Sequence, residues 1–143
     1  MNLFEKIAKG LGSFFAPRSP AAPVAPRQAL NVTRGTLLAT KLELAGTGPS
    51  RNKGLLGREG LLAGEGLWIV PCEAVHTFFM RFPIDLVYLD RKHLIRKVRS
   101  NVGAWRMSAC LTAHSVLELP AGTIRATRTE RGDTIEIGPA LTS

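Results

Sequence analysis

The segment VHTFFMRFPIDLVYLDRKHLIRKV (residues 75–98) contains the pattern that predicts the fold. It holds three short runs rich in aromatic and branched side chains, at residues 75–80, 84–90 and 93–98. Such runs are typical of β-strands, because these side chains pack well on a pleated surface. Pro83 separates the first two runs, since proline cannot donate a hydrogen bond to a strand ladder. Asp90 favours a turn, so the second and third runs are predicted to form a hairpin.

Similar runs occur on both sides of this segment, at residues 37–45, 66–70, 114–119 and 133–137. Between them, residues 48–60 indicate a short helix broken by glycines, with Ser50 as its cap. Residues 121–129 indicate a short helix or turn, and residues 101–113 show no period and are expected to form a loop. Many short strands with few helices predict a mainly β (α+β) fold, a compact antiparallel β-barrel or sandwich-like domain with one or two short helices.

The first 29 residues differ in character from the rest of the chain. Residues 1–15 place apolar side chains on one helical stripe and mostly polar or basic side chains on the other, which predicts an amphipathic helix. Residues 16–29 form a Pro/Ala-rich linker, because prolines at every third position resist both helix and sheet. The β-barrel-like domain is therefore assigned to residues 30–140. The helix is interpreted as a docking element for an anionic membrane surface or a partner, or as a helix on its own domain.

The composition is ordinary, but the charge is not. Of 143 residues, 45% are apolar and 21% are charged, as expected of a globular domain, whereas the net charge is +8. A charge of this size favours acidic partners such as nucleic acid, anionic lipid or an acidic protein. No apolar run approaches the roughly 20 residues that span a bilayer. We expect a cytoplasmic protein that needs no cofactor, and peripheral contact with a membrane is one of the roles left open for residues 1–15.

Five motifs in order carry a family resemblance. They are GLLGR (54–58), GEGLWIVP (64–71), HTFFMRFPIDLVYLD (76–90), VLELPAG (116–122) and RGDTIEI (131–137). Together they resemble the family called domain of unknown function 192, over roughly residues 35–138. One departure is Leu56, where members often carry methionine. The resemblance implies a compact, mainly antiparallel β-barrel-like domain with short helices, and it implies neither an activity nor a compartment.

Asp85 is the polar residue whose position most needs an explanation. By strand alternation it shares a face with Val87 and Leu89, which is expected to be the core face. A buried unpaired carboxylate is costly, so we expect an arginine or backbone amides to satisfy Asp85. Glu118 raises the same question, and a pair of the two acids would favour an enzyme. The candidate residues for a ligand pocket are His76, Met80, Arg81, Asp85, Trp105 and Arg58.

Two cysteines and two histidines recur at matching intervals, as Cys72, His76, Cys110 and His114. They are ligand types that zinc prefers, but residues four apart in a strand lie roughly 13 Å apart, so no metal site is expected. Cys72 and Cys110 are interpreted as a buried thiol pair or a disulfide. An alternative function is an enzyme that uses Asp85 with His76 or a cysteine at the barrel end, although no catalytic residue is assigned.

Basic residues concentrate between positions 91 and 106. The patch consists of Arg91, Lys92, Arg96, Lys97, Arg99 and Arg106. It could contact phosphates, but aromatic residues for base stacking are few, and basic residues also protect an exposed edge strand. Nucleic-acid binding is therefore an alternative that is not favoured. The favoured hypothesis is a non-catalytic module, tethered by its N-terminal arm, that binds a small ligand or a protein partner.

Overall fold

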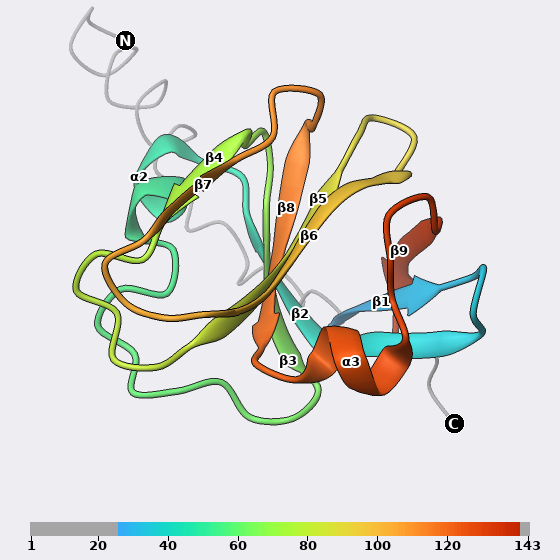
Figure 1. The fold of residues 1–143 in the computed structure, drawn as a ribbon, viewed down its shortest axis with the longest axis horizontal. Helices are drawn as coiled ribbons and strands as arrows, with labels where there is room; N and C mark the ends of the chain where they lie inside the picture. Colours follow the sequence, from blue (N-terminus) through green and yellow to red (C-terminus); the bar gives the residue numbers. More distant parts are fainter. Residues whose placement is uncertain (1–25, 141–143) are drawn as a thin grey trace, which may run out of the picture.

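A computed structural model describes residues 26–140 of the chain (Figure 1). The predicted amphipathic helix (1–15) and most of the predicted linker (16–25) lie outside the described residues. Strand β1 (Arg27–Asn31) begins inside the range assigned to the linker, because it pairs with residues 135–139, which are remote in the sequence. Within residues 26–140, no helix has the length and the apolar character needed to cross a membrane.

The described residues form a mainly β fold, which confirms the fold class predicted from the sequence. The strands are β1 (Arg27–Asn31), β2 (Thr36–Ala45), β3 (Glu65–Ile69), β4 (Ala74–His76), β5 (Ile84–Leu89), β6 (Ile95–Val102), β7 (Met107–Ala109), β8 (Ser115–Pro120) and β9 (Ile135–Pro139), and the helices are α2 (Gly48–Lys53) and α3 (Thr123–Thr127). Seven strands form one sheet in the order β6-β5-β8-β3-β2-β1-β9, and β4 pairs with β7 in a second sheet.

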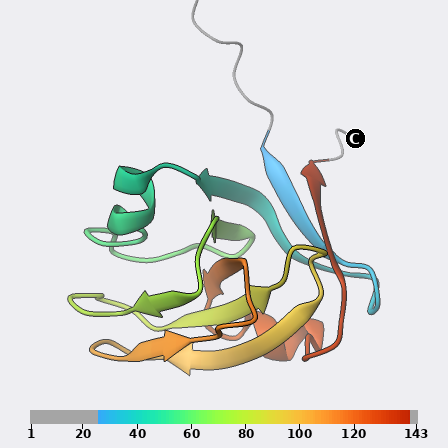
Figure 2. The same ribbon diagram turned by 90° about the horizontal axis from the view of Figure 1, so that it is seen from above.

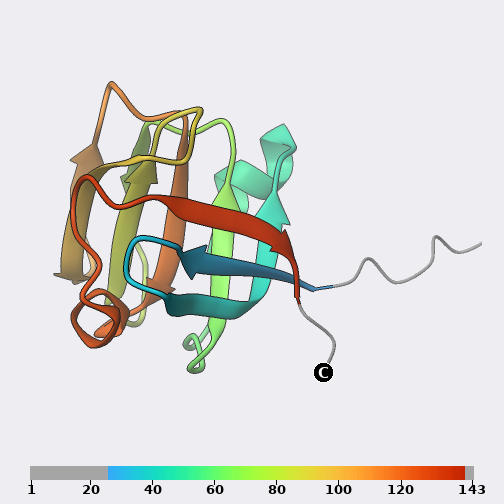
Figure 3. The same cartoon turned by 90° about the vertical axis from the view of Figure 1, so that its right-hand side faces the viewer.

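Strand β2 turns the corner of the large sheet. Its first part pairs with β1 and its last part, residues 41–45, pairs with β3. Strands β1 and β9 therefore cross the direction of β5, β6 and β8 (Figure 3). The two ends of the sheet approach each other, since the Ile95 amide donates to the Asp133 carbonyl at 2.8 Å and the Ile135 amide donates to the His93 carbonyl at 3.0 Å. The result is a curled sheet that forms a half-barrel.

One strand pair departs from the antiparallel arrangement expected from the sequence. Strands β2 and β3 are parallel. Parallel neighbours need a long crossover connection, and here α2 and the loop at residues 54–64 return the chain to the same end of the sheet. This crossover matters for function, because it carries α2 and its following loop to the pocket described below.

Two segments differ locally from the sequence prediction. The run at residues 75–80 is a strand only as far as His76, since Phe79 adopts a positive φ of 63° that an extended ladder does not accept. Conversely, Met107–Ala109 forms β7 inside the segment expected to be a loop, because it pairs with β4.

A buried polar network joins β1 to the turn before β9. Asn31 is fully buried, and its Nδ2 donates to Asp133 Oδ2 at 2.9 Å and to Thr129 Oγ1 at 3.1 Å. Burial raises the pKa of Asp133, but hydrogen bonds from Asn31, Arg34 and the Glu130 amide together hold it below its ordinary value. The network therefore binds the carboxylate form of Asp133 and fixes the edge of the sheet.

We expect Asn31→Ala to lower the free energy of unfolding by about 2–3 kcal/mol, because it removes two buried hydrogen bonds, one of them to a carboxylate. Urea unfolding followed by circular dichroism measures the loss. Thr33→Ala is the matched control in the same hairpin, since the Thr33 hydroxyl accepts from the Thr134 amide at 2.9 Å in an exposed position. Equal losses for the two variants would contradict a structural role for the buried network.

Candidate functional site

A cavity of about 420 Å³ lies between the end of α2 and strand β4, and the Glu118 side chain of β8 lines it. Helix α2 lies beside β4 in Figure 1. Other residues of the wall are Arg51, Lys53, Gly54, Cys72, His76 and Met80. We call this cavity the Glu118 pocket.

Local sequence positions α2 at the pocket. The Ser50 amide donates to Thr47 Oγ1 at 3.2 Å, and the Thr47 amide donates to Ser50 Oγ at 3.0 Å, which is a capping box. The cap is therefore Thr47 and not Ser50, which the sequence favoured. The helix ends at Lys53, and its C-cap residue is Gly54, whose φ of 48° suits glycine and whose amide donates to the Ser50 carbonyl at 3.0 Å.

Glu118 is the unusual residue of the pocket. It pairs in the sheet with Leu67 and Leu86, on the face that carries the apolar core around α2 and β4. Its side chain is almost completely buried, with 5% exposure, and its Oε2 has no hydrogen-bond partner in the described part of the chain. A Cβ atom built on Gly54 would lie 3.9 Å from Oε2, so the loop backbone faces the carboxyl group directly.

Burial changes the protonation of this acid. Desolvation raises the pKa of Glu118 to about 7, and the charge of Arg58 lowers it only in part. The Arg58 guanidinium is already engaged, because its Nη2 donates to Glu43 Oε2 at 2.7 Å. Glu118 is therefore a carboxyl group that exchanges its proton near neutral pH beside a cavity, an arrangement that is common at functional sites.

The thiol that lines the pocket, Cys72, is not activated. The Cys72 Sγ donates to the Ala74 carbonyl at 3.2 Å, and desolvation raises the pKa of Cys72. A raised pKa keeps the thiol protonated, whereas nucleophilic cysteines need the thiolate. Cys72 and Cys110 are both free thiols and both pack against the same core cluster. Among residues 26–140, no three side chains of the types that bind metals lie close enough to share an ion, so Cys72, His76, Cys110 and His114 do not converge.

Asp85 does not belong to the pocket. It is completely buried, and its two oxygens accept hydrogen bonds from the backbone amides of Asn101 and Ile124, both at 2.8 Å. It pairs with Leu119, whereas Glu118 pairs with Leu86, so the two acids point to opposite faces of the sheet. The geometry therefore gives no support to an enzyme in which Asp85 acts with His76 or with Glu118.

The remaining candidate residues fall into two groups. His76 and Met80 line the Glu118 pocket, and the positive charge of Arg58 lowers the pKa of Glu118 in part. Arg81 and Trp105 are exposed and lie outside its wall. The sequence analysis identified Glu118 as an acid in an apolar strand but did not predict it as a pocket residue. It did not predict Arg51 or Gly54 as pocket residues either. The sequence feature that indicates Glu118 is its position as a single acid within the apolar run VLELP.

The basic patch is divided by the fold. Arg91 and Lys92 lie at the turn between β5 and β6, where Asp90 and Glu73 line the same cavity. The Lys97 ammonium donates to the Ala109 carbonyl at 2.7 Å and lies 5.7 Å from the centre of the Tyr88 ring. Arg106 follows Trp105 near the opposite end of the hairpin. Arg99 is exposed and Arg96 half-buried, so the six residues differ both in exposure and in their position along the hairpin.

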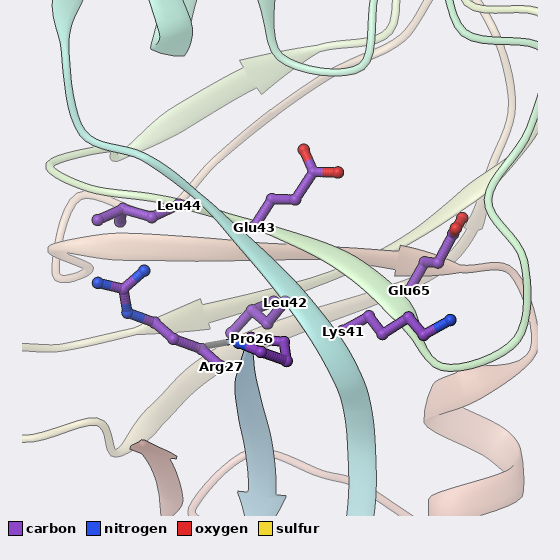
Figure 4. A pocket seen from close by; sticks show the side chains of 7 residues that line it. All are labelled: Pro26, Arg27, Lys41, Leu42, Glu43, Leu44 and Glu65. Atoms are coloured by element: carbon purple, nitrogen blue, oxygen red, sulfur yellow. The ribbon is translucent and has the colours of Figure 1, made fainter. Parts of the chain in front are cut away.

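A larger cavity, of about 740 Å³, lies on the outer surface of β2 (Figure 4). Its charged side chains do not converge, since Arg27 and Lys41 point away from each other on either side of β2 in Figure 4. Glu43 belongs to this surface and pairs with Arg58. A site needs polar groups directed at one point, so the Glu118 pocket is the better candidate.

Fold and pocket together define a small half-barrel β domain with one proton-exchanging carboxyl group in a polar cavity. The sequence profile of the family described as uncharacterized ACR, domain of unknown function 192, matches residues 29–137, and the chain belongs to this family.

Individual relatives agree with this assignment. The chain is 28% identical over 116 residues to the UPF0127 protein TK1120 of Thermococcus kodakarensis, covering 77% of this chain and 73% of that protein. Two crystal structures share the fold at 20% identity and a TM-score of 0.68. One is a putative transcription regulator from Sinorhizobium meliloti (81% of this chain and 97% of that chain), and the other a protein of unknown function from Novosphingobium aromaticivorans (84% and 94%).

Proposed function

We propose that this domain binds a small polar molecule in the Glu118 pocket and does not convert it chemically. The observation that carries the proposal is Glu118 Oε2, a buried acceptor without a partner in the described residues, next to a cavity. A buried polar atom without a partner is costly, and an N–H or O–H group of a ligand would remove that cost.

The other residues of the wall narrow the class of ligand. Arg51 and Lys53 lie at the end of α2 on the same cavity, where they favour an anionic group. An amino acid or a hydroxy acid fits these residues, because it carries both a hydrogen-bond donor for Glu118 and a carboxylate for Arg51 and Lys53. The protonated thiol of Cys72 and the position of Asp85 on the other face support binding without catalysis.

Residues 1–25 complete the proposal as an arm that tethers the domain to an anionic membrane surface or to a protein partner. The amphipathic pattern of residues 1–15 and the prolines that follow support this role of the arm. Because β1 begins at Arg27, a truncation that tests the arm has to stop at residue 25.

Glycine and glycolate test the pocket, because each joins a carboxylate to one donor, whereas acetate carries the carboxylate alone. We expect saturable shifts of the Gly54, Leu55 and Cys72 amide resonances in NMR titrations with glycine or glycolate, and weaker shifts with acetate. Since the pKa of Glu118 is raised to about 7, its ionised fraction and the affinity for glycine should rise about tenfold between about pH 6 and pH 8.

Glu118→Leu should abolish these shifts, and Glu136→Leu, which removes an exposed acid on β9 outside the pocket wall, is the control. Shifts that persist in Glu118→Leu, or pocket amides that respond to neither glycine nor glycolate, would contradict the proposed ligand class.

A further inference from the structure

Exposed apolar side chains gather at two loops, residues 77–82 and 103–106, and at the first residue of β7. Phe79 is 72% exposed, Trp105 57% and Met107 71%. The Trp105 ring centre lies 4.6 Å from that of Phe79 and 5.7 Å from that of Phe78, so the rings form one surface. Both loops lie at the left-hand end of the molecule in Figure 1 and again in the view from above (Figure 2). We call Phe78, Phe79, Trp105 and Met107 the aromatic platform.

A single buried residue holds the two loops together. Thr77 is 2% exposed, its carbonyl accepts from the Trp105 amide at 3.0 Å, and its amide donates to the Arg106 carbonyl at 2.9 Å. Its Oγ1 donates to the Gly103 carbonyl at 2.6 Å and accepts from the Arg106 amide at 2.9 Å. The rings are therefore presented by a fixed scaffold.

The backbone that presents the rings is itself unusual. Phe79 has a φ of 63° and Trp105 a φ of 61°, a left-handed conformation that residues other than glycine and asparagine seldom adopt. Large aromatic residues in this conformation, exposed to water, do not contribute to a core. Strained backbone of this kind concentrates at functional sites.

The charges around the platform are positive. Arg81 and Arg106 flank the rings and are both exposed, and residues 76–82 and 103–107 contain no acid. The described structure pairs Arg81 only with Glu59, at 3.4 Å, and both side chains are mostly exposed. Such a pair is weak and leaves the guanidinium free to turn toward another anion.

We propose that the aromatic platform docks on an anionic lipid surface. Phe79, Trp105 and Met107 would enter the boundary between head groups and acyl chains, where aromatic rings are favoured, and Arg81 and Arg106 would contact lipid phosphates. Nucleic acid fits less well, because Lys97 is engaged by the Ala109 carbonyl and the rings pack on one another at tilted or edge-on angles. This surface is separate from the Glu118 pocket, and its test is independent of the ligand.

The fluorescence of Trp105 measures contact between the aromatic platform and lipid directly. The chain has two tryptophans, so full-length Trp68→Phe protein reports Trp105 alone, and residues 1–25 contribute no tryptophan signal. On vesicles of phosphatidylglycerol and phosphatidylcholine we expect blue-shifted Trp105 emission and quenching by brominated acyl chains, with little effect from phosphatidylcholine alone. Phe79→Ser and Arg106→Glu should each reduce the quenching of Trp105 by brominated acyl chains by about fivefold or more at the same lipid concentration, whether or not residues 1–25 also contact the vesicle. Leu62→Ser is the matched control, since Leu62 is 73% exposed outside the platform.

Vesicle binding without quenching of Trp105 would overturn the proposal and assign binding to another part of the chain. A Trp105 shift that appears on self-association, or with single-stranded DNA but not with vesicles, would overturn it in favour of a second copy or a nucleic acid. Circular dichroism checks the fold of each variant. If Trp68→Phe does not fold, the emission difference between the natural chain and Trp105→Phe gives the same measurement.

Discussion

Replacing Asp85 with alanine is expected to lower the free energy of unfolding by about 3 kcal/mol. The buried carboxylate accepts from the amides of Asn101, at the end of β6, and Ile124, in the first turn of α3. The N-cap residue of α3 is Gly122, which has no side chain to accept from the helix. Alanine would leave both elements without their shared acceptor, and the Ile124 amide would stay buried and unpaired.

Asp90→Ala is the matched control for this loss. Asp90 Oδ1 also accepts from two backbone amides, those of Lys92 at 2.9 Å and Leu94 at 3.0 Å, but it lies in a half-buried turn. Water can replace the acceptor there, so we expect a loss of about 1 kcal/mol. Urea unfolding at neutral pH compares the two variants. An Asp85→Ala loss no larger than that of Asp90→Ala would contradict the structural role of Asp85.

The inward direction of Asp85 was predictable, and its partners were not. Alternation in IDLVYLD and the cost of an unpaired buried carboxylate are local arguments, and they indicate an acid satisfied by its scaffold. The donors lie 16 and 39 residues away along the chain. The identity of these donors depends on where α3 and the end of β6 pack in the fold. A local sequence pattern does not predict that packing.

The Glu118 pocket was likewise predictable only in part: its strands were, and the way they come together was not. The apolar strands around it were recognisable from their side chains, but the pocket joins residues 51–54, residues 72–76 and Glu118. Bringing α2 to this place requires the parallel pairing of β2 with β3, which the expectation of a mainly antiparallel sheet did not include. The strand predicted from the high β-propensity of Phe78 and Phe79 was also wrong, because these two residues lie in a loop after β4 and not in a strand.

Glu118→Gln is expected to change how stability depends on pH. The pKa of Glu118 is about 7 in the folded protein, against an ordinary value of 4.5. The folded state therefore binds more protons than the unfolded state between these values, and the free energy of unfolding falls as pH rises through this window. The difference corresponds to about 3 kcal/mol above pH 7. Glutamine is neutral at every pH and should remove this loss.

The variant should thus match the natural chain near pH 4.5 and exceed it by about 3 kcal/mol near pH 8, measured by urea unfolding at each pH. Glu136→Gln, which removes an exposed acid on β9, is the control and should leave the pH dependence unchanged. A constant difference between Glu118→Gln and the natural chain at all pH values would contradict the raised pKa. Bound glycine should oppose the loss at high pH, because the ammonium group stabilises the ionised carboxylate, so the same titration with glycine connects the stability of the domain to its proposed ligand.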